Sequence, residues 1–321
     1  MLSANPSPRM ARLSLVLAAV LWSSGSVFVR VLRDPTGLDL ESPRLTPLQI
    51  AVFRGLFAGL VLIPLLRRRD LKFQPAMLAM MLCFTTMSGL YLSALALGSA
   101  ANAIFLQNTA PVWVCILTVY LLGERAGRRT WESVLLGLLG ALVLVSGNWP
   151  WGATPEQYAV ETEILLMGVG SGFMYACVVL FLGKLRNQSS AWLTVLNLLG
   201  SAVGLSLFVV YHEGWAGSLA WFSTPTLRQL GFLAVFGAVQ MALPYWLFAR
   251  GVRAIGTQEA GIITLLEPVL NPVWAYLISP ETEVPTQWTI VGGGLLLLAL
   301  GWRYVPESPR PTSTPPEQPS S

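Results

Sequence analysis

Ten runs of apolar residues follow one another along the chain, and short polar segments separate them. Each run is close to the ~20 residues of α-helix that cross a hydrocarbon core about 30 Å thick. The pattern predicts ten membrane-spanning helices with no room between them for a separate soluble domain. The predicted spans are 12–32, 47–66, 74–94, 100–122, 130–147, 163–183, 191–211, 227–249, 257–278 and 285–304.

The polar segments carry different charges on the two sides that these spans define. Segments on the side of both termini contain fifteen Lys and Arg residues, whereas segments on the other side contain three. Cytoplasmic segments of membrane proteins carry the excess of basic residues. We therefore predict a multi-pass protein of the cell (inner) membrane with both termini in the cytoplasm.

Composition supports a membrane protein and narrows the chemistry. Of the 321 residues 54% are hydrophobic and 11% are charged, whereas soluble domains carry about 25% charged residues. The net charge of +4 comes from basic clusters between spans, so we predict a lipid bilayer as partner and no nucleic acid. The three cysteines lack paired spacing and the chain has one histidine, so no metal site or resident cofactor is predicted.

An internal repeat relates the two halves of the chain. The segment YLLGERAGRRTW follows the fourth span, and YLISPETEVPTQW follows the ninth. At a constant offset, Pro111 aligns with Pro268 and Glu124 aligns with Glu281, without a gap. Each half holds five helices, an odd number, so the halves are predicted to have opposite orientations in the membrane. Inverted repeats of this kind are typical of secondary transporters, whose substrate site lies between the halves.

The predicted fold is therefore an all-α polytopic membrane protein with two inverted five-helix repeats. The tail is rich in Pro and Ser and is expected to be disordered in the cytoplasm. The predicted units are the first repeat at 1–147, an external linker at 148–162, the second repeat at 163–305 and the tail at 306–321.

Several segments resemble the EamA-type family of the drug/metabolite transporter superfamily. They include LAAVLWSSGSVFVR in the first span, VFRGLFAGLVLIPLL in the second and TLLEPVLNPVWAYL in the ninth. The resemblance implies ten helices around a central cavity, alternating access and transport of metabolites, often export of amino acids or related compounds. The positions that match family motifs are Trp22, Arg54, Pro111, Glu124, Tyr175, Glu267 and Pro268.

Glu267 stands in the middle of the ninth span, within LLEPVLNPVWAYL. A carboxylate at the centre of a membrane helix costs about 2.5–3.5 kcal/mol, so it is expected to face a wet cavity or a partner. A structural alternative is a protonated carboxyl that hydrogen-bonds a neighbouring helix. In a cavity, Glu267 is also a candidate proton-binding group that would couple transport to a proton gradient.

Proline residues flank this carboxylate. Pro268 and Pro272 remove backbone donors and free the carbonyl groups four residues earlier. Free carbonyl groups at membrane depth are tolerated where they line a cavity, but a kink that only fits the helix to its neighbours explains the prolines equally. We predict helix kinks at Pro111, Pro268 and Pro272.

Arg54 is a second charge inside a predicted span. At 1.5 Å per helical residue, its depth differs from that of Glu267 by about 5 Å, within reach of a long side chain. We hypothesise that Arg54 and Glu267 pair, directly or through substrate or water, with snorkelling of Arg54 to the headgroups as the alternative. A zwitterion could bind between them, its carboxylate at Arg54 and its ammonium at Glu267.

Further polar and aromatic residues lie at similar depths. A cavity that binds a polar metabolite would supply partners for them, whereas Asn and Gln also bridge membrane helices and Trp also anchors span ends. Together with Glu267 and Arg54, the predicted substrate or coupling residues are Trp22, Tyr91, Asn108, Trp113, Tyr175, Gln240, Tyr245, Trp246 and Asn271.

These features favour a secondary transporter of a small polar or zwitterionic metabolite, an amino acid or a derivative, acting as an exporter by alternating access. The alternatives are a non-transport membrane protein, either a sensor or an intramembrane enzyme. An enzyme would need a nucleophile with its base, or a metal cluster, at matched depth, and the spans show neither. Small-xxx-small patterns such as GLFAG leave a homodimer open.

Overall fold

The computed structural model describes residues 7–252, 254–255 and 257–304, and no strand occurs among them. The predicted tail at 306–321 lies outside the described residues. Helices follow one another as α1 Pro8–Ser23, α2 Gly25–Val31, α3 Pro47–Leu62, α4 Pro75–Leu97, α5 Ala100–Gln107, α6 Ala110–Leu122, α7 Arg128–Gly147, α8 Pro155–Lys184, α9 Ser190–Ser223, α10 Leu227–Phe236, the π-helical segment η3 Gly237–Ala242, α11 Leu243–Gly251, α12 Thr257–Thr264, α13 Leu266–Ile278 and α14 Gln287–Tyr304.

Short polar sequences start several of these helices. At α3, α8 and α10 a threonine hydroxyl accepts a hydrogen bond from the backbone N–H of a glutamine three residues later. The side-chain oxygen of that glutamine accepts a hydrogen bond from the backbone N–H of the threonine. This capping box satisfies two of the backbone donors that a helix start leaves free. The local sequence therefore fixes where these three helices begin, and the pairs are Thr46 with Gln49, Thr154 with Gln157, and Thr226 with Gln229.

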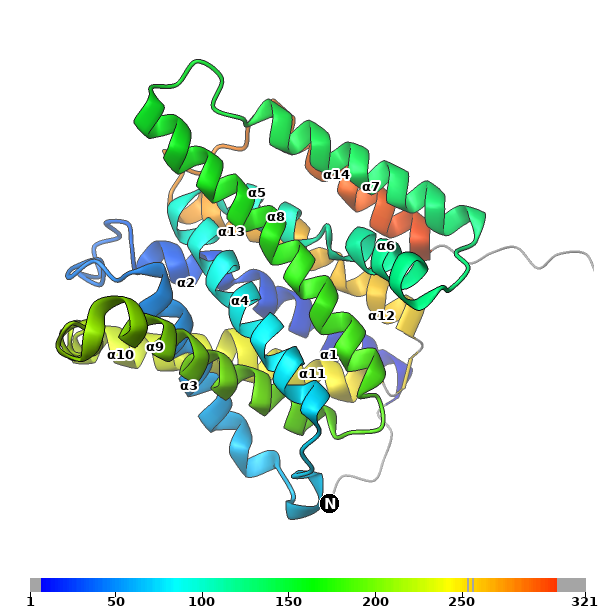
Figure 1. Cartoon of the computed structure of the whole chain (residues 1–321), viewed down its shortest axis with the longest axis horizontal. Coiled ribbons are helices and arrows are strands. Elements are labelled where there is room, and N and C mark those ends of the chain that lie inside the picture. The colour runs from blue at the N-terminus through cyan, green and yellow to red at the C-terminus, as the bar shows by residue number, and fades with distance from the viewer. Residues whose placement is uncertain (1–6, 253, 256, 305–321) are drawn as a thin grey trace, which may run out of the picture.

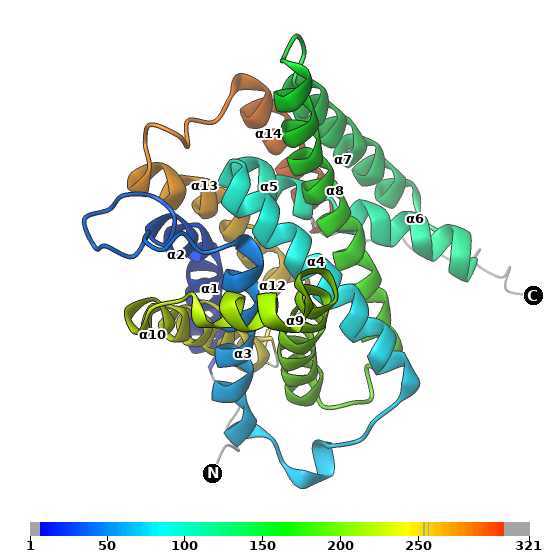
Figure 2. The same cartoon turned by 60° about the vertical axis from the view of Figure 1, so that its left-hand side comes forward.

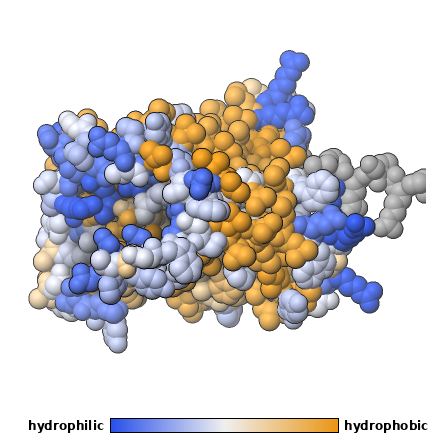
Figure 3. All heavy atoms as spheres, turned by 90° about the horizontal axis from the view of Figure 1, so that it is seen from above, coloured by the Kyte–Doolittle hydropathy of each residue, from blue (hydrophilic) through white to orange (hydrophobic). Residues whose placement is uncertain are grey.

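The helices have the length and composition of membrane spans. Within the described part of the chain, nine helical segments are long and apolar enough to cross a membrane. The tenth predicted span corresponds to α14, which is 18 residues long but has polar residues at both ends. Hydrophobic side chains gather in a broad zone between hydrophilic clusters (Figure 3). The prediction of an all-α polytopic membrane protein is confirmed.

Several predicted spans are interrupted or have different ends in the observed structure. The first predicted span, 12–32, is divided into α1 and α2 by a turn around Ser24. The seventh, 191–211, continues to Ser223 in α9, past a break at Gly214, where φ is +69°. Glycine has no Cβ and adopts this left-handed conformation readily, so the chain can turn there and continue as helix.

The packing relates the two halves as a pseudo-twofold axis would. In the first half, α4 packs along α8 of the second, and its counterpart is the packing of α11 in the second half along α1 of the first. Equivalent helices meet near the axis: α3 packs on α9, α5 on α13, and α7 on α14 (Figure 1). In Figure 2, α5 lies between α13 and α8, where the halves meet.

The α7–α14 contact depends on the absence of side chains. A Cβ atom built on Gly140 would lie 2.8 Å from the carbonyl oxygen of Gly292, and one on Gly292 would lie 2.6 Å from the carbonyl oxygen of Gly140. Small residues allow membrane helices to approach closely and gain van der Waals contact. The last helix of each half is thereby joined to the other.

Candidate functional site

Four of the membrane-crossing segments lose regular α-helical geometry in mid-course. The breaks lie between α1 and α2, between α5 and α6 around Asn108, in η3 between α10 and α11, and at Leu265 between α12 and α13. Pro111 is the second residue of α6, and Pro268 is the third residue of α13, so each follows directly after a break. Pro272 lies inside α13, which continues through it. Discontinuous helices in transporters expose backbone groups at the substrate site.

Arg54 of α3 is buried near these breaks, with 4% of its surface exposed. One terminal nitrogen donates to Gln240 Oε1 at 3.4 Å, and the other donates to Ser88 Oγ of α4 at 3.5 Å. The guanidinium carbon lies 5.3 Å from the centre of the Phe236 ring, a cation–π contact. Both hydrogen bonds are long, and Nε has no partner in the described structure. A buried guanidinium held so loosely can accept a better partner.

Gln240 connects Arg54 to the break in the first helix. Its side-chain nitrogen donates at 2.9 Å to the carbonyl oxygen of Trp22, just before the turn at Ser24. The Trp22 ring meets Tyr245 of α11 edge to face, with 5.4 Å between ring centres. The π-helical turn of η3 carries Gln240, and such turns often lie at functional sites. Its wider turn therefore places an amide between Arg54 and a carbonyl group freed by the helix break.

One face of α13 presents Glu267, Asn271 and Trp274, which are spaced by one turn. The Trp274 indole donates to Ser23 Oγ at 2.9 Å, and the backbone carbonyl oxygen of Asn271 accepts from Ser26 Oγ at 2.8 Å. Leu266, Val269 and Val273, on the opposite face, are 36–46% exposed, as expected for lipid contact. The polar face of α13 is thus turned toward the break between α1 and α2.

Asn271 is fully buried, yet neither atom of its side-chain amide makes a hydrogen bond in the described structure. The Tyr91 side chain lies beside it without closing a well-formed bond. Glu267 retains intermediate exposure although protein surrounds it. Buried polar groups without partners are costly, so free donors and acceptors that face one interior region are what a polar ligand would satisfy.

Two tyrosines lie close to both charged side chains, Arg54 and Glu267. Tyr91 of α4 and Tyr245 of α11 each lie within electrostatic range of both Arg54 and Glu267. No ion pair joins Arg54 directly to Glu267 among the described residues, because the guanidinium is directed at Gln240 and Ser88. The direct form of the hypothesised pair is absent in this conformation, and the form bridged by substrate or water stays a prediction.

Four of the eleven predicted substrate or coupling residues lie away from the group around Arg54 and Glu267. Asn108 donates to the carbonyl oxygen of Ile104 in its own helix, and the Trp113 indole donates to Thr109 and packs on Phe173 of α8. Trp246 packs instead against exposed Arg250, one turn later, and Tyr175 is 41% exposed. The remaining seven predicted residues, Trp22, Arg54, Tyr91, Gln240, Tyr245, Glu267 and Asn271, form what we call the central cluster.

The sequence prediction missed Ser88, Phe236 and Ser26, which contact members of the central cluster, and it missed the hydrogen bond between Trp274 and Ser23. Serine and aromatic residues are common in membrane helices and give no signal by themselves. Ser88 and Phe236 are recognisable only from the fold, which places α4 and α10 beside Arg54.

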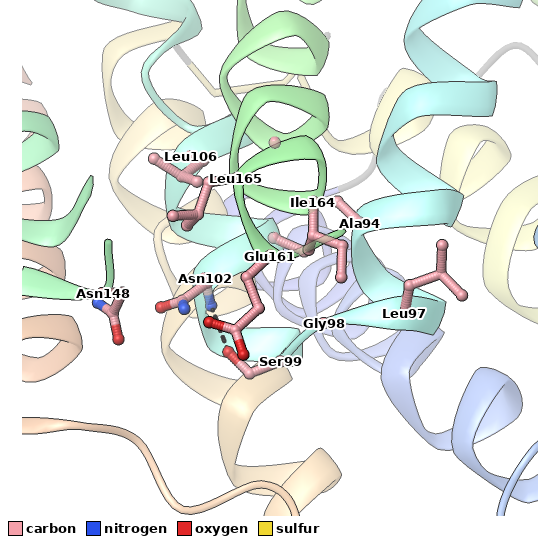
Figure 4. A pocket seen from close by; sticks show the side chains of 12 residues that line it. Ala94, Leu97, Gly98, Ser99, Asn102, Leu106, Asn148, Glu161, Ile164 and Leu165 are labelled. Atoms are coloured by element: carbon pink, nitrogen blue, oxygen red, sulfur yellow. Dashed lines mark hydrogen bonds between the residues drawn. The ribbon is translucent and has the colours of Figure 1, made fainter. Parts of the chain in front are cut away.

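A pocket lies apart from the central cluster, at one end of the helices. It has a volume of about 210 Å³ and is walled by the α4–α5 turn and by α8. Figure 4 shows Glu161 reaching into it toward Ser99. None of the predicted site residues lines it, and Glu161 is exposed. We place the candidate site in the central cluster, where buried charges converge. No cluster of three metal-ligating side chains occurs within the described ranges.

Comparisons with known proteins identify relatives that are named as transporters. The profile of the EamA-like transporter family matches residues 9–146 and 162–303. An uncharacterized transporter of Archaeoglobus fulgidus is 31% identical over 92% of this chain and 97% of its own. The pseudopaline exporter CntI of Pseudomonas aeruginosa is 26% identical over 80% of this chain and 86% of its own. A crystal structure, 15% identical, superposes with a TM-score of 0.59 over 91% of this chain and 96% of that one.

Proposed function

Because the chain belongs to the EamA-like transporter family, we propose that it is a secondary transporter of a small polar or zwitterionic metabolite, an amino acid or a derivative. The observation that carries this proposal is the position of two opposite charges, Arg54 and Glu267, around the same two tyrosines without a direct bond between them. Transport would proceed by alternating access between the two repeats, with the central cluster as the substrate site.

The proposed chemistry follows from what each group offers. The carboxylate of a zwitterion would replace Gln240 and Ser88 as acceptor of the Arg54 N–H groups, because a charged acceptor binds more strongly than a neutral one. Its ammonium group would lie at Glu267, and the free amide of Asn271 would donate to or accept from the substrate. A zwitterion therefore neutralises both buried charges at once.

The proposed direction is outward. Support comes from the exporter name of one relative, CntI. Coupling to protons is proposed at Glu267, because a carboxyl group that alternates between substrate ammonium and proton would exchange one for the other.

The substrate can be found by untargeted metabolite profiling of cells and medium, with and without the gene, followed by flux measurements in vesicles. We expect at least one zwitterionic compound to be depleted in the medium when the gene is removed and to move in vesicles that contain the protein. Normal medium composition together with zero flux of every zwitterion tested would contradict the proposal.

A double-mutant cycle tests the bridge between the charges. Glu267→Gln and Arg54→Leu are each expected to lower the flux by at least tenfold, and the double variant is expected to lose less than the product of the two losses. Residues that share a bound partner couple by about 0.5–3 kcal/mol. Glu161→Gln is the matched control, because it removes an exposed carboxylate. Purely multiplicative losses would rule out a shared ligand.

A further inference from the structure

A second group of buried charges lies outside the central cluster. Arg30 of α2 is 6% exposed, and Glu283, in the loop between α13 and α14, is 2% exposed. Arg30 Nη2 forms an ion pair with Glu283 Oε1, and Asp34 lies 3.9 Å from Arg30 Nη1. Two buried opposite charges stabilise a contact only when further hydrogen bonds complete their coordination.

The hydrogen bonds around this pair come from a third segment, the α4–α5 turn. Arg30 also donates to the carbonyl oxygens of Leu95, at 3.0 Å, and Gly98, at 2.5 Å. Both oxygens of Glu283 accept from the backbone nitrogen of Ala100, at 2.9 and 3.2 Å, where α5 begins. The positive end of a helix favours a carboxylate. One ion pair therefore holds three segments from both halves together.

A second contact reinforces the pair at the same end. Ser279, at the end of α13, donates to Asp34 Oδ2 at 2.5 Å. The loop from Ser279 to Glu283 thus has two attachments to the end of the first membrane helix. By the predicted orientation, this is the outer end of the cavity, and Gly98 also lines the pocket in Figure 4.

The opposite end of the same two membrane segments has a weaker contact. Arg12 of α1 pairs with Glu259 of α12 at 2.5 Å, but their side chains are 55% and 41% exposed. Solvent-exposed ion pairs contribute only about 0–1 kcal/mol. In this conformation the first and ninth membrane segments are held together by buried charges at the outer end and by solvated charges at the inner end.

The buried pair lies directly above the central cluster. Ser26 is one helical turn before Arg30 on α2, and its hydroxyl bonds the carbonyl oxygen of Asn271, which belongs to the cluster. A path from the outer surface to the substrate site between α2 and α13 would therefore pass Arg30 and Glu283 first.

We propose that Arg30 and Glu283 form the outer gate of this path, closed in the present conformation. The proposal rests on the proposed transport function, which requires the outer end to open. An ion pair suits a gate better than an apolar contact, because both charges are rehydrated by the water that enters as the pair separates. In the closed state the ion pair fixes the relative position of the two segments. In the open state water hydrates each charged side chain.

Access of a thiol reagent from outside tests the gate without any substrate. In a variant with Cys83, Cys115 and Cys177 replaced by alanine, Ser26→Cys is exposed to a membrane-impermeant methanethiosulfonate in intact cells. We expect slow labelling in this background and at least tenfold faster labelling when Glu283→Gln is added. Glu281→Gln is the matched control, since it removes the charge of an exposed carboxylate in the same loop, and it should leave the rate unchanged.

A disulfide separates opening of the gate from general loosening of the fold. Cysteines at Asp34 and Ser279, whose side chains are in contact, should form a disulfide on oxidation and suppress labelling of Ser26→Cys even with Glu283→Gln. A reductant should restore it. If Glu283→Gln does not fold, Arg30→Lys, which keeps the charge but has fewer donors, should accelerate labelling instead.

Equal labelling rates with and without these substitutions, or labelling that the disulfide does not suppress, would overturn the gate. Since labelling requires no transported compound, an absence of flux would count against the proposed function alone.

Discussion

The substitution Gly237→Ala tests the close contact between η3 and α3, because it adds one methyl group at that contact. A Cβ atom on Gly237 would lie 2.6 Å from the carbonyl oxygen of Arg54 and 2.7 Å from the backbone nitrogen of Ala58. Because Cβ contacts shorter than 3.0 Å are essentially never found, Gly237→Ala must move the two helices apart by about 0.4 Å at this point, and packed interiors cannot absorb such a shift locally.

This displacement acts on the bond between Arg54 and Gln240, three residues after Gly237. The bond is already 3.4 Å long, so a further few tenths of an ångström would break it. Hydrogen bonds to charged groups contribute about 1.5–3 kcal/mol, and a bond of this length belongs at the lower limit. A loss of about 1.5 kcal/mol corresponds to roughly a tenfold change in an equilibrium. Overpacking adds about 1–3 kcal/mol of destabilisation.

Because the substrate carboxylate is proposed to replace Gln240 at Arg54, we expect Gly237→Ala to lower the substrate concentration that gives half-maximal flux about tenfold, and overpacking should lower the thermal unfolding temperature of the purified protein. Gly231→Ala is the control on the adjoining helix α10, since no atom lies within 4 Å of the added carbon. Indistinguishable half-maximal concentrations and unfolding temperatures in the two variants would refute the argument that this helix contact sets the position of Gln240.

Two further predictions concern the contact of the two halves and the gate. Gly292→Ala should lower the unfolding temperature because its methyl group would meet the α7 backbone at 2.6 Å, whereas Gly294→Ala, with open space around it, should not. Burial raises the pKa of Glu283 above the usual value of a carboxyl group, against the opposing effect of Arg30. The ion pair therefore exists above that pKa and is lost as the pH falls through it, so labelling of Ser26→Cys should accelerate at acidic outer pH. Glu283→Gln should abolish this pH dependence.

The arrangement of helices could be predicted because it rests on local signals. Hydrophobic runs of span length predict the membrane helices, and the aligned Pro111 and Pro268 indicate equivalent positions in the two halves. The helix breaks just before these prolines follow from the missing backbone donors. The π-helical segment Gly237–Ala242 is likewise followed by a proline, Pro244 at the second position of α11, whereas no proline lies beside the break at Ser24.

The candidate site was predictable in part, for a related physical reason. A buried charge such as Arg54 or Glu267 is visible in the sequence because its cost in the membrane is independent of its neighbours. Which groups meet that charge depends on the rotation and tilt of each helix. Asn108 and Trp246 are amide and aromatic residues within predicted spans, as Gln240 and Tyr245 are. Asn108 and Trp246 nevertheless lie outside the central cluster, whereas Gln240 and Tyr245 belong to it.

Arg30 shows the limit of this reasoning most clearly. It stands near the end of a predicted span, where an arginine is expected to extend to the headgroups, so nothing local distinguishes it from a surface residue. Its partner Glu283 lies in an acidic loop at the other end of the chain, where a solvated carboxylate is equally expected. Only the packing of α2 and the α13–α14 loop against the α4–α5 turn excludes water from both. The contact between Arg30 and Glu283 joins segments that are distant in sequence and buries their charges where the two halves meet. It therefore forms only when the halves have the relative position seen here. That position is what the proposed alternating access must change.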